Sequence, residues 1–194
     1  MLHDFSQIYA VIDPWCGRMP HAPIELDMGC GFGSFTLALA RRFPDRLVLG
    51  TDLNSNRLRK IEKKAALAGL VNLELLHTTS LPLAGFMLPN ACIRRIHLLC
   101  PDPWPKGKHR GRRLVTSDFL TRVARVLEPG GILHMSTDHG PYFDALRNTA
   151  EGLPFFEPAP EAIAEIADIK TDFERIWTAQ GKSVPHAAYR RVER

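Results

Sequence analysis

Three glycines, each separated by one residue, follow an apolar stretch and stand directly before a helical pattern: Gly29, Gly31 and Gly33. Glycine tolerates positive φ and lets a ligand approach the backbone closely, and the following helix start offers free N–H groups. The frame differs from the dinucleotide fingerprint, because Ser34 stands where the third glycine is expected. Asp27 precedes the first glycine, and a carboxylate there suits a ligand amine better than a pyrophosphate. S-adenosylmethionine carries such an amine, so the cluster favours it over NAD; a plain strand-to-helix turn is the alternative.

A second carboxylate, Asp52, follows the next apolar stretch, Leu47–Gly50. An acid at that place in an α/β sheet accepts hydrogen bonds from both hydroxyls of a ribose. NAD and S-adenosylmethionine share a ribose, so Asp52 does not separate them, and a solvated acid at a helix start is the alternative. After the third apolar stretch come three hydroxyl residues, Thr78–Ser80. Their hydroxyls suit the edge of an adenine, and a turn explains them equally well.

The basic segment 101–113 contains three prolines that stiffen its backbone and hold Asp102 and Trp104 at set angles. The Asp102 carboxylate can accept N–H groups of a nucleobase, whereas Trp104 either stacks on a base or packs beneath the segment. From residue 101 to residue 125 the chain has seven basic residues and only two acidic ones. The net charge of the whole chain is +4. Its surplus is therefore concentrated in one stretch, which is the pattern of a polyanion-binding surface.

Apolar runs and helical patterns alternate along the chain. Strands are expected at residues 24–28, 47–50, 71–76, 93–100, 132–137 and 187–192, and helices at 35–42, 55–68, 118–127, 141–151 and 171–180. Asn54 is expected to cap the second helix and Ser117 or Asp118 the third, while residues 162–169 fit a short helix or a strand. This alternation predicts a doubly wound sheet. Ligands of such sheets bind beyond the carboxyl ends of the strands, where every cluster named above falls.

The composition is that of an ordinary globular protein, with 45% hydrophobic and 24% charged residues in 194 positions. We therefore expect a single domain over residues 1–194, with a short N-terminal segment at 1–22. No apolar run approaches the ~20 residues that cross a membrane, and the start lacks the pattern of a signal peptide. The four cysteines form no CxxC pair. These features predict a reduced protein of the cytoplasm without a metal site.

Four motifs together resemble the tRNA (guanine-N7-)-methyltransferase family: Pro101-Asp-Pro-Trp-Pro-Lys106, Arg112-Arg-Leu-Val115, Ser136-Thr-Asp-His-Gly-Pro-Tyr142 and Thr171-Asp-Phe-Glu174. The glycine cluster alone indicates only a class I methyltransferase. The resemblance implies a Rossmann-like fold with a mostly parallel seven-stranded sheet and helices on both faces. It also implies methyl transfer from S-adenosylmethionine to N7 of a guanine in tRNA, expected at guanine 46 of the variable loop.

The resemblance also implies roles for single residues. The cofactor would be contacted by Asp27, the three glycines, Asp52, Thr79 and Asp102. Asp102 corresponds to the aspartate treated as catalytic in relatives. The substrate would be contacted by Lys106, Asp138, Thr171, Asp172, Phe173 and Glu174. The implied partner is tRNA, and the protein is expected to be a monomer or a homodimer.

The chain departs from the family at three of these positions. Relatives usually carry Glu at the places of Asp27 and Asp52, and Asp or Asn at the place of Thr79. Two rival functions therefore stay open, a methyltransferase of another RNA or of a small molecule, and a non-catalytic RNA-binding relative. A nicotinamide-dependent enzyme is disfavoured by the glycine frame. We interpret His134 as an ordinary histidine of a strand, and His139 as a rim residue beside Asp138.

Overall fold

The computed structural model describes residues 1–4, 22–104 and 106–193 of the chain. Within these ranges the strands form one sheet in the order β1-β4-β3-β2-β5-β6-β8-β7. Their bounds are β1 Leu2–Asp4, β2 Ile24–Met28, β3 Leu47–Asp52, β4 Leu73–His77, β5 Ile93–Leu99, β6 Leu127–Ser136, β7 Phe156–Pro158 and β8 His186–Arg191. Neighbouring strands pair in parallel, except that β8 lies antiparallel to both β6 and β7. The predicted doubly wound, mostly parallel sheet is confirmed.

The sheet has eight strands, one more than the seven that the resemblance implies, and both β1 and β7 fall outside the six strand ranges predicted from the sequence. The extra strand β1 pairs with β4 in the register Leu2↔Leu75, although the sequence placed the first strand at residue 24. A three-residue strand is too short to show a hydrophobic period, and its pairing with β4 defines it. The rest of the expected N-terminal segment, including Cys16, lies outside the described residues.

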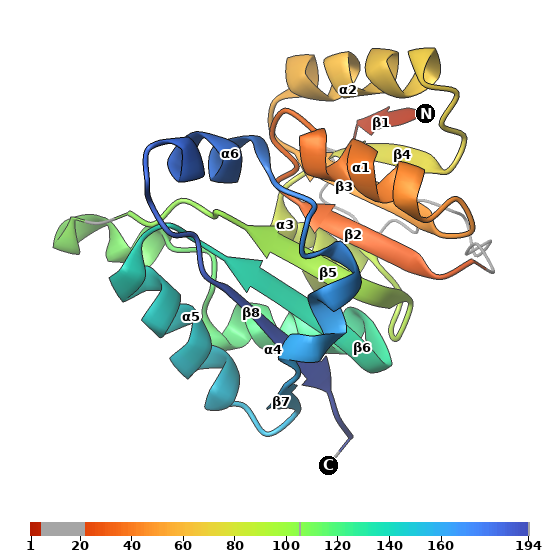
Figure 1. The fold of residues 1–194 in the computed structure, drawn as a ribbon. Coiled ribbons are helices and arrows are strands. Elements are labelled where there is room, and N and C mark those ends of the chain that lie inside the picture. The colour runs from red at the N-terminus through yellow and green to blue at the C-terminus, as the bar shows by residue number, and fades with distance from the viewer. Residues whose placement is uncertain (5–21, 105, 194) are drawn as a thin grey trace.

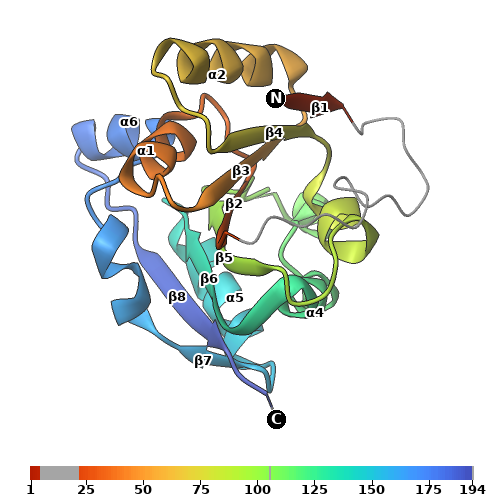
Figure 2. The same ribbon diagram turned by 90° about the vertical axis from the view of Figure 1, so that its right-hand side faces the viewer.

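Helices cover both faces of the sheet (Figures 1 and 2). One face packs against α1, α2 and the 3-10 helix η3, and the other against the π-helical turn η1, α4 and α5. Their bounds, with those of the remaining helices, are α1 Ser34–Arg42, α2 Ser55–Leu67, α3 Ser80–Pro82, η1 Leu83–Met87, η2 Gly107–Arg112, α4 Ser117–Val126, α5 Gly140–Glu151, η3 Pro160–Ile166 and α6 Asp172–Ala179. In the part of the chain that is described, no helix is both long and apolar enough to span a membrane.

Local signals explain most helix ends. The Asn54 side chain caps α2 by accepting from the backbone N–H groups of Asn56 and Arg57, as predicted. The cap of α4 is Thr116, whose hydroxyl accepts from Phe119 N at 3.1 Å. The expected caps, Ser117 and Asp118, are wrong by one or two positions because both lie in the first turn. Residues 162–169 belong mainly to η3 rather than to a strand.

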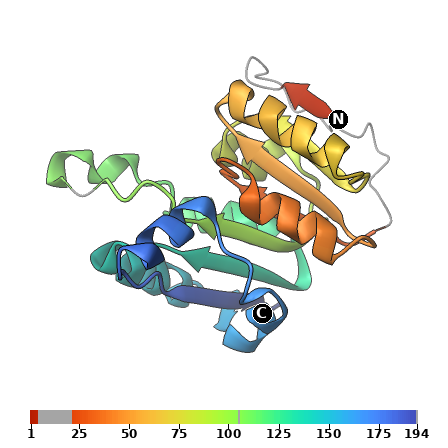
Figure 3. The ribbon, with the colours of Figure 1, turned by 45° about the horizontal axis from the view of Figure 1, so that its top comes forward.

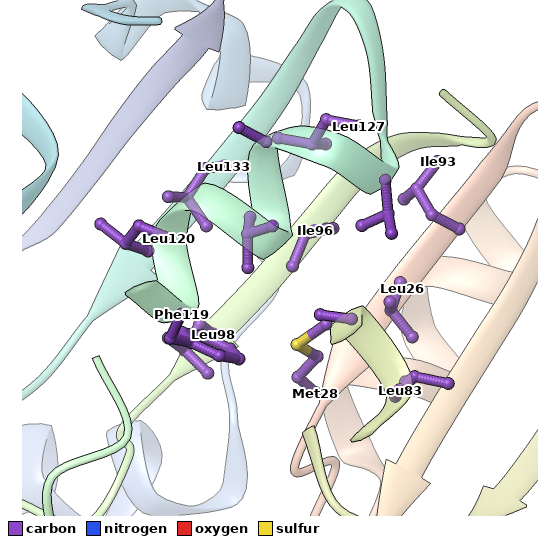
Figure 4. Packing of buried hydrophobic residues seen from close by; sticks show 14 of the residues in the cluster. Leu26, Met28, Leu83, Ile93, Ile96, Leu98, Phe119, Leu120, Leu127 and Leu133 are labelled. Carbon is purple, nitrogen blue, oxygen red and sulfur yellow. The ribbon is translucent and has the colours of Figure 1, made fainter. Parts of the chain in front are cut away.

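The central strands are covered on both faces, which explains their nearly continuous apolar sequences. In the cluster of Figure 4, Leu26 and Met28 of β2 and Ile96 of β5 pack with Phe119 and Leu120 of α4. All five side chains are at most 2% exposed. Burial of each such side chain contributes about 1.5–3 kcal/mol. This core fixes the strands whose carboxyl ends carry the polar clusters.

Gly33, just before α1, has a φ of +83° and lies against α2. A Cβ atom there would stand 2.5 Å from Cγ1 of Ile61. We expect Gly33→Ala to lower the free energy of unfolding by about 2–4 kcal/mol, from left-handed strain and overpacking together. Urea denaturation measures the loss. Gly130→Ala is the control, because Gly130 has a φ of +76° and open space around its Cβ position. An equal loss in both variants would contradict the packing contribution.

Candidate active site

A cavity of about 500 Å³ opens at the carboxyl ends of β2, β3, β4 and β5. The six predicted site residues that line it are Gly29, Gly31, Asp52, Thr79, Asp102 and Phe173. They come from five separate segments of the chain, and the parallel sheet brings them to one edge. Ligand pockets typically measure ~300–1,000 Å³, so the cavity can accept a small molecule together with part of a larger one.

The carboxylate of Asp52 joins the end of β3 to the glycine loop. Its Oδ2 accepts from Gly31 N at 3.0 Å, and its Oδ1 accepts from Asn54 N at 2.7 Å. Arg57 Nη1 lies 3.7 Å from Oδ2, and the Arg57 side chain also lines the cavity. Each carboxylate oxygen can accept more than one hydrogen bond. Asp52 therefore shapes the loop and keeps acceptor capacity for a ligand hydroxyl.

Asp27 lies beneath the glycine loop and lines a narrow extension of about 20 Å³ instead of the main cavity. Its side chain is 3% exposed, and its Oδ2 accepts from the Thr36 hydroxyl at 2.6 Å. Burial raises the pKa of Asp27 to about 7, the Thr36 hydrogen bond opposes the rise, and the charge of Asp52 adds to it. A ligand cation placed in this extension would stabilise the ionised carboxylate.

The four residues Thr171–Glu174 start α6, which forms one wall of the site. The Thr171 hydroxyl caps the helix by accepting from Glu174 N at 3.0 Å. Asp172 accepts from the Ser34 hydroxyl at 2.6 Å and from Ser34 N at 3.3 Å, so α6 is attached to the start of α1. Phe173 is 41% exposed and lines both the cavity and its extension. Glu174 points away from the cavity and is buried in ion pairs.

The segment after β5 carries Asp102 and Trp104 to the cavity. Asp102 is exposed, whereas Trp104 is partly buried and has a φ of +40°. The ring of Trp104 meets His109 edge to face at 5.9 Å between centroids, and the Arg112 guanidinium lies 5.1 Å from it. Of the two interpretations of Trp104, the structure shows a ring that packs within the segment and still lines the cavity.

Arg113 holds the basic segment to the body of the protein. Its Nε donates to Pro103 O at 2.8 Å, and its guanidinium lies 4.6 Å from the ring of Tyr142 on α5. Beyond this attachment η2 projects away from the sheet, as Figure 3 shows. Lys106, at the start of the projection, is exposed. The basic segment is therefore placed to contact a ligand much larger than the cavity.

Among the described residues, four predicted site residues line neither the cavity nor its extension: Gly33, Lys106, Asp138 and Glu174. Gly33 packs on α2, Lys106 lies on the projecting segment, and Asp138 is partly buried after β6. Arg57 lines the cavity but was not among the predicted site residues. Its position three residues after the Asn54 cap is a signal that could have placed it at this edge.

The sequence matches, over residues 21–187, the model of a family described as "Putative methyltransferase". It is 31% identical over 172 residues to a tRNA (guanine-N(7)-)-methyltransferase of Syntrophotalea carbinolica, covering 87% of this chain and 74% of the relative. It is 35% identical over 156 residues to one of Verminephrobacter eiseniae, covering 75% of this chain and 55% of that relative. The chain thus spans little more than half the length of several relatives. The fold is similar to that of the 16S rRNA methyltransferase KamB, with a TM-score of 0.63, 22% identity and 88% of each chain covered.

The raised pKa of Asp27 predicts how the free energy of unfolding depends on pH. Because its folded pKa is raised from 3.8 to about 7, the folded protein binds a proton between these values that the unfolded chain has released. Stability should therefore fall as pH rises from 4 to 7, by about 1.4 kcal/mol per pH unit at most. Asp27→Asn should remove this loss, so that the Tm difference between variant and parent protein grows in favour of the variant from pH 5 to pH 8. A Tm difference that does not change with pH would contradict the raised pKa. Asp45→Asn, on the exposed loop after α1, is the control.

Proposed function

The chain belongs to the tRNA (guanine-N(7)-)-methyltransferase family, and we propose that it transfers a methyl group from S-adenosylmethionine to N7 of a guanine in tRNA. The observation that carries this proposal is the cavity in which the glycine loop, Asp52 and Thr79 face Asp102, beside the projecting basic segment. The expected target is guanine 46 of the variable loop. The relatives' names and the four motifs support the substrate, and the cavity supports the cofactor.

The donor set of the site fits S-adenosylmethionine. Asp27 offers a carboxylate for the amine, and backbone groups of Gly29 and Gly31 border the cavity. Asp52 offers acceptor capacity for ribose hydroxyls, and the exposed Thr79 offers a hydroxyl for the adenine. When bound, the cofactor supplies an electrophilic methyl group. The shorter carboxylate of Asp52, compared with the usual Glu, lies close enough to the backbone to bind Gly31 N and Asn54 N.

We assign to Asp102 the role of stabilising positive charge on the purine. Guanine N7 already has a lone pair, so methylation requires no general base. The purine ring becomes cationic as N7 is alkylated, and a carboxylate that accepts from N1–H or N2–H interacts more strongly with the cationic form. Asp102 lines the cavity and is exposed, so a base that has left its stack can reach it. The protein also contributes by holding both reactants in line.

One experiment tests this proposal against its two alternatives, a methyltransferase of another acceptor and a non-catalytic RNA-binding protein. The chain is incubated with labelled S-adenosylmethionine and unmodified tRNA, and the labelled nucleotide is mapped. Label at N7 of the variable-loop guanine supports the proposal. Transfer only to another RNA or to a small acceptor would show a different methyltransferase. If calorimetry detects binding of tRNA but none of S-adenosylmethionine, the chain is a non-catalytic RNA-binding protein.

We expect Asp102→Asn to lower kcat with tRNA by about 100-fold, because removal of one charge-stabilising group typically costs ~10²–10³ in rate. The Kd of S-adenosylmethionine is measured separately, and the rate is compared with the cofactor at saturation. Single-turnover transfer measures the rate, and Asp45→Asn, on the exposed loop that precedes β3, is the matched control. An unchanged turnover of the Asp102 variant would contradict the charge-stabilising role.

We expect Lys106→Ala to weaken tRNA binding and to make its salt dependence shallower. Loss of one phosphate contact should reduce the slope of log K against log [salt] by about 0.7–0.9. Filter binding at several salt concentrations gives this slope. Arg41→Ala, exposed in the last turn of α1, is the control for loss of one positive charge. Equal slopes for the parent protein and the Lys106 variant would exclude a phosphate contact.

A further inference from the structure

A row of five polar side chains crosses the sheet beneath α1: Glu25 of β2, His97 of β5, His134 of β6, His186 of β8 and Glu174 of α6. We call this row the imidazole chain. Its four contacts measure 2.9 Å from Glu25 to His97, 3.0 Å from His97 to His134, 2.8 Å from His134 to His186 and 3.1 Å from His186 to Glu174. The ring of Phe35 on α1 packs on His97 with centroids 4.9 Å apart. Each contact is short enough to be a hydrogen bond.

Cations hold both terminal carboxylates in their ionised form. Arg95 binds Glu25 through two hydrogen bonds of 2.8 and 2.9 Å, and Arg46 adds a third at 2.6 Å. Burial opposes the charge of Glu25, but His97 and Arg95 hold its pKa well below the usual value. At the other end, Lys170 Nζ lies 2.7 Å from Glu174. Burial again opposes the charge, and His186 and Lys170 lower the pKa of Glu174.

The four contacts require one proton more than three neutral imidazoles carry. An ionised carboxylate only accepts hydrogen bonds, so His97 Nε2 and His186 Nε2 must both be protonated. The two contacts between rings need one N–H each. The imidazole chain therefore needs four N–H groups, whereas three neutral rings provide one each. One of the three rings must be an imidazolium.

The surroundings of the rings select His186 for this charge. His97 is fully buried, and burial lowers its pKa although the contact with Glu25 opposes this, while Arg95 lowers it further. His134 is 2% exposed, has imidazoles on both sides, and its pKa is lowered well below normal by burial and by those two rings. The His186 side chain is 21% exposed and contacts a carboxylate.

Other charged groups near His186 do not compete for this proton. Lys170 reaches it only through Glu174. On β8 itself Arg190 pairs with Glu161 of η3 at 2.9 Å. Beyond His134 the charges of Glu25 and Arg95 neutralise each other in direct contact. Within the described ranges, no group of three or more His, Cys, Asp or Glu residues is arranged to hold a metal ion. The four contacts themselves make the imidazole chain a hydrogen-bonded array.

We propose that the imidazole chain stores one proton as the imidazolium of His186, and that His186 is a positioning residue that fixes α6 at the active-site cavity. The contact with Glu174 attaches α6 to β8, and the same helix presents Phe173 to the cavity and ties Asp172 to Ser34. The link to methyl transfer rests on the proposed function. The protonation pattern does not depend on it.

The pattern of protons is tested by ¹⁵N NMR of the imidazoles in the complete chain at pH 7. We expect His97 to carry its proton on Nε2, His134 on Nδ1, and His186 on both nitrogens. Three singly protonated rings, or an imidazolium at His97 or His134, would overturn the proposal. Because the parent protein is measured, this test does not depend on whether a variant folds or transfers methyl groups.

Positioning is tested by hydrogen exchange of the amides of α6. In the parent protein, protection factors of α6 should fall when the His186 proton is lost on raising the pH, while those of α4 stay constant. In His186→Gln the protection factors of α6 should be lower by about tenfold, because a neutral amide binds the Glu174 carboxylate more weakly than an imidazolium does. They should also no longer change with pH. Glu161→Gln, which removes a β8 ion pair outside the imidazole chain, should leave the profile of the parent protein unchanged. Unaltered protection of α6 in His186→Gln would overturn the positioning role.

The kcat/KM for tRNA should follow the same pH profile in the parent protein and lose it in His186→Gln. If the parent protein transfers no methyl group but shows the expected NMR and exchange results, the proposed function fails and the inference stands. If transfer occurs but its pH profile is the same in His186→Gln, the link between the stored proton and the reaction fails.

Discussion

The buried carboxylate of Glu25 is the interaction on which the centre of the sheet depends. It is fully buried on β2 and accepts hydrogen bonds from Arg46, Arg95 and His97. A buried charge without partners is strongly destabilising, whereas a fully hydrogen-bonded one is tolerated. Glu25 therefore fixes the positions of β5 and of the loop before β3 relative to β2, because both must supply donors to its carboxylate. Glu165, which pairs with Arg46 and Arg95, extends this requirement to η3.

The buried polar side chains of the sheet and the candidate active site are connected through helix α6. From Glu25 the imidazole chain leads across the sheet to Glu174, and Glu174 lies on the helix that borders the cavity. From the other direction Asp52 holds the glycine loop, and Asp172 holds the start of α1 after that loop. Helix α6 is thus attached on both sides. This attachment holds Phe173, the one exposed residue of 171–174, against the cavity.

The departures from the family motifs have a physical interpretation in this structure. Asp52 is short and makes hydrogen bonds to two backbone N–H groups, so the loop is held by the residue that is expected to bind the ribose. Asp27 is deeply buried, and its pKa near 7 makes its charge sensitive to whatever occupies the space beside it. Asp52 supports the glycine loop directly, whereas the Asp27 carboxylate is held by the Thr36 hydroxyl of α1. The basic segment 101–113 contributes Asp102, Trp104 and Arg112 to the cavity, and its η2 part projects away from the sheet (Figure 3), where we propose that it contacts tRNA.

The alternation of strands and helices, the glycine loop, and the clusters at Asp52 and Asp102 could be predicted from the amino-acid sequence. These signals are local, since each depends on a hydrophobic period, a cap or a turn residue within a few positions. The folded structure was needed to show which of these segments meet. It placed Gly33 on α2, Lys106 on a projection and Glu174 in the interior, and it assembled the imidazole chain from five distant elements. His134 alone gives no sign of such an array, because its partners are defined by strand order and register, which no short segment of sequence contains.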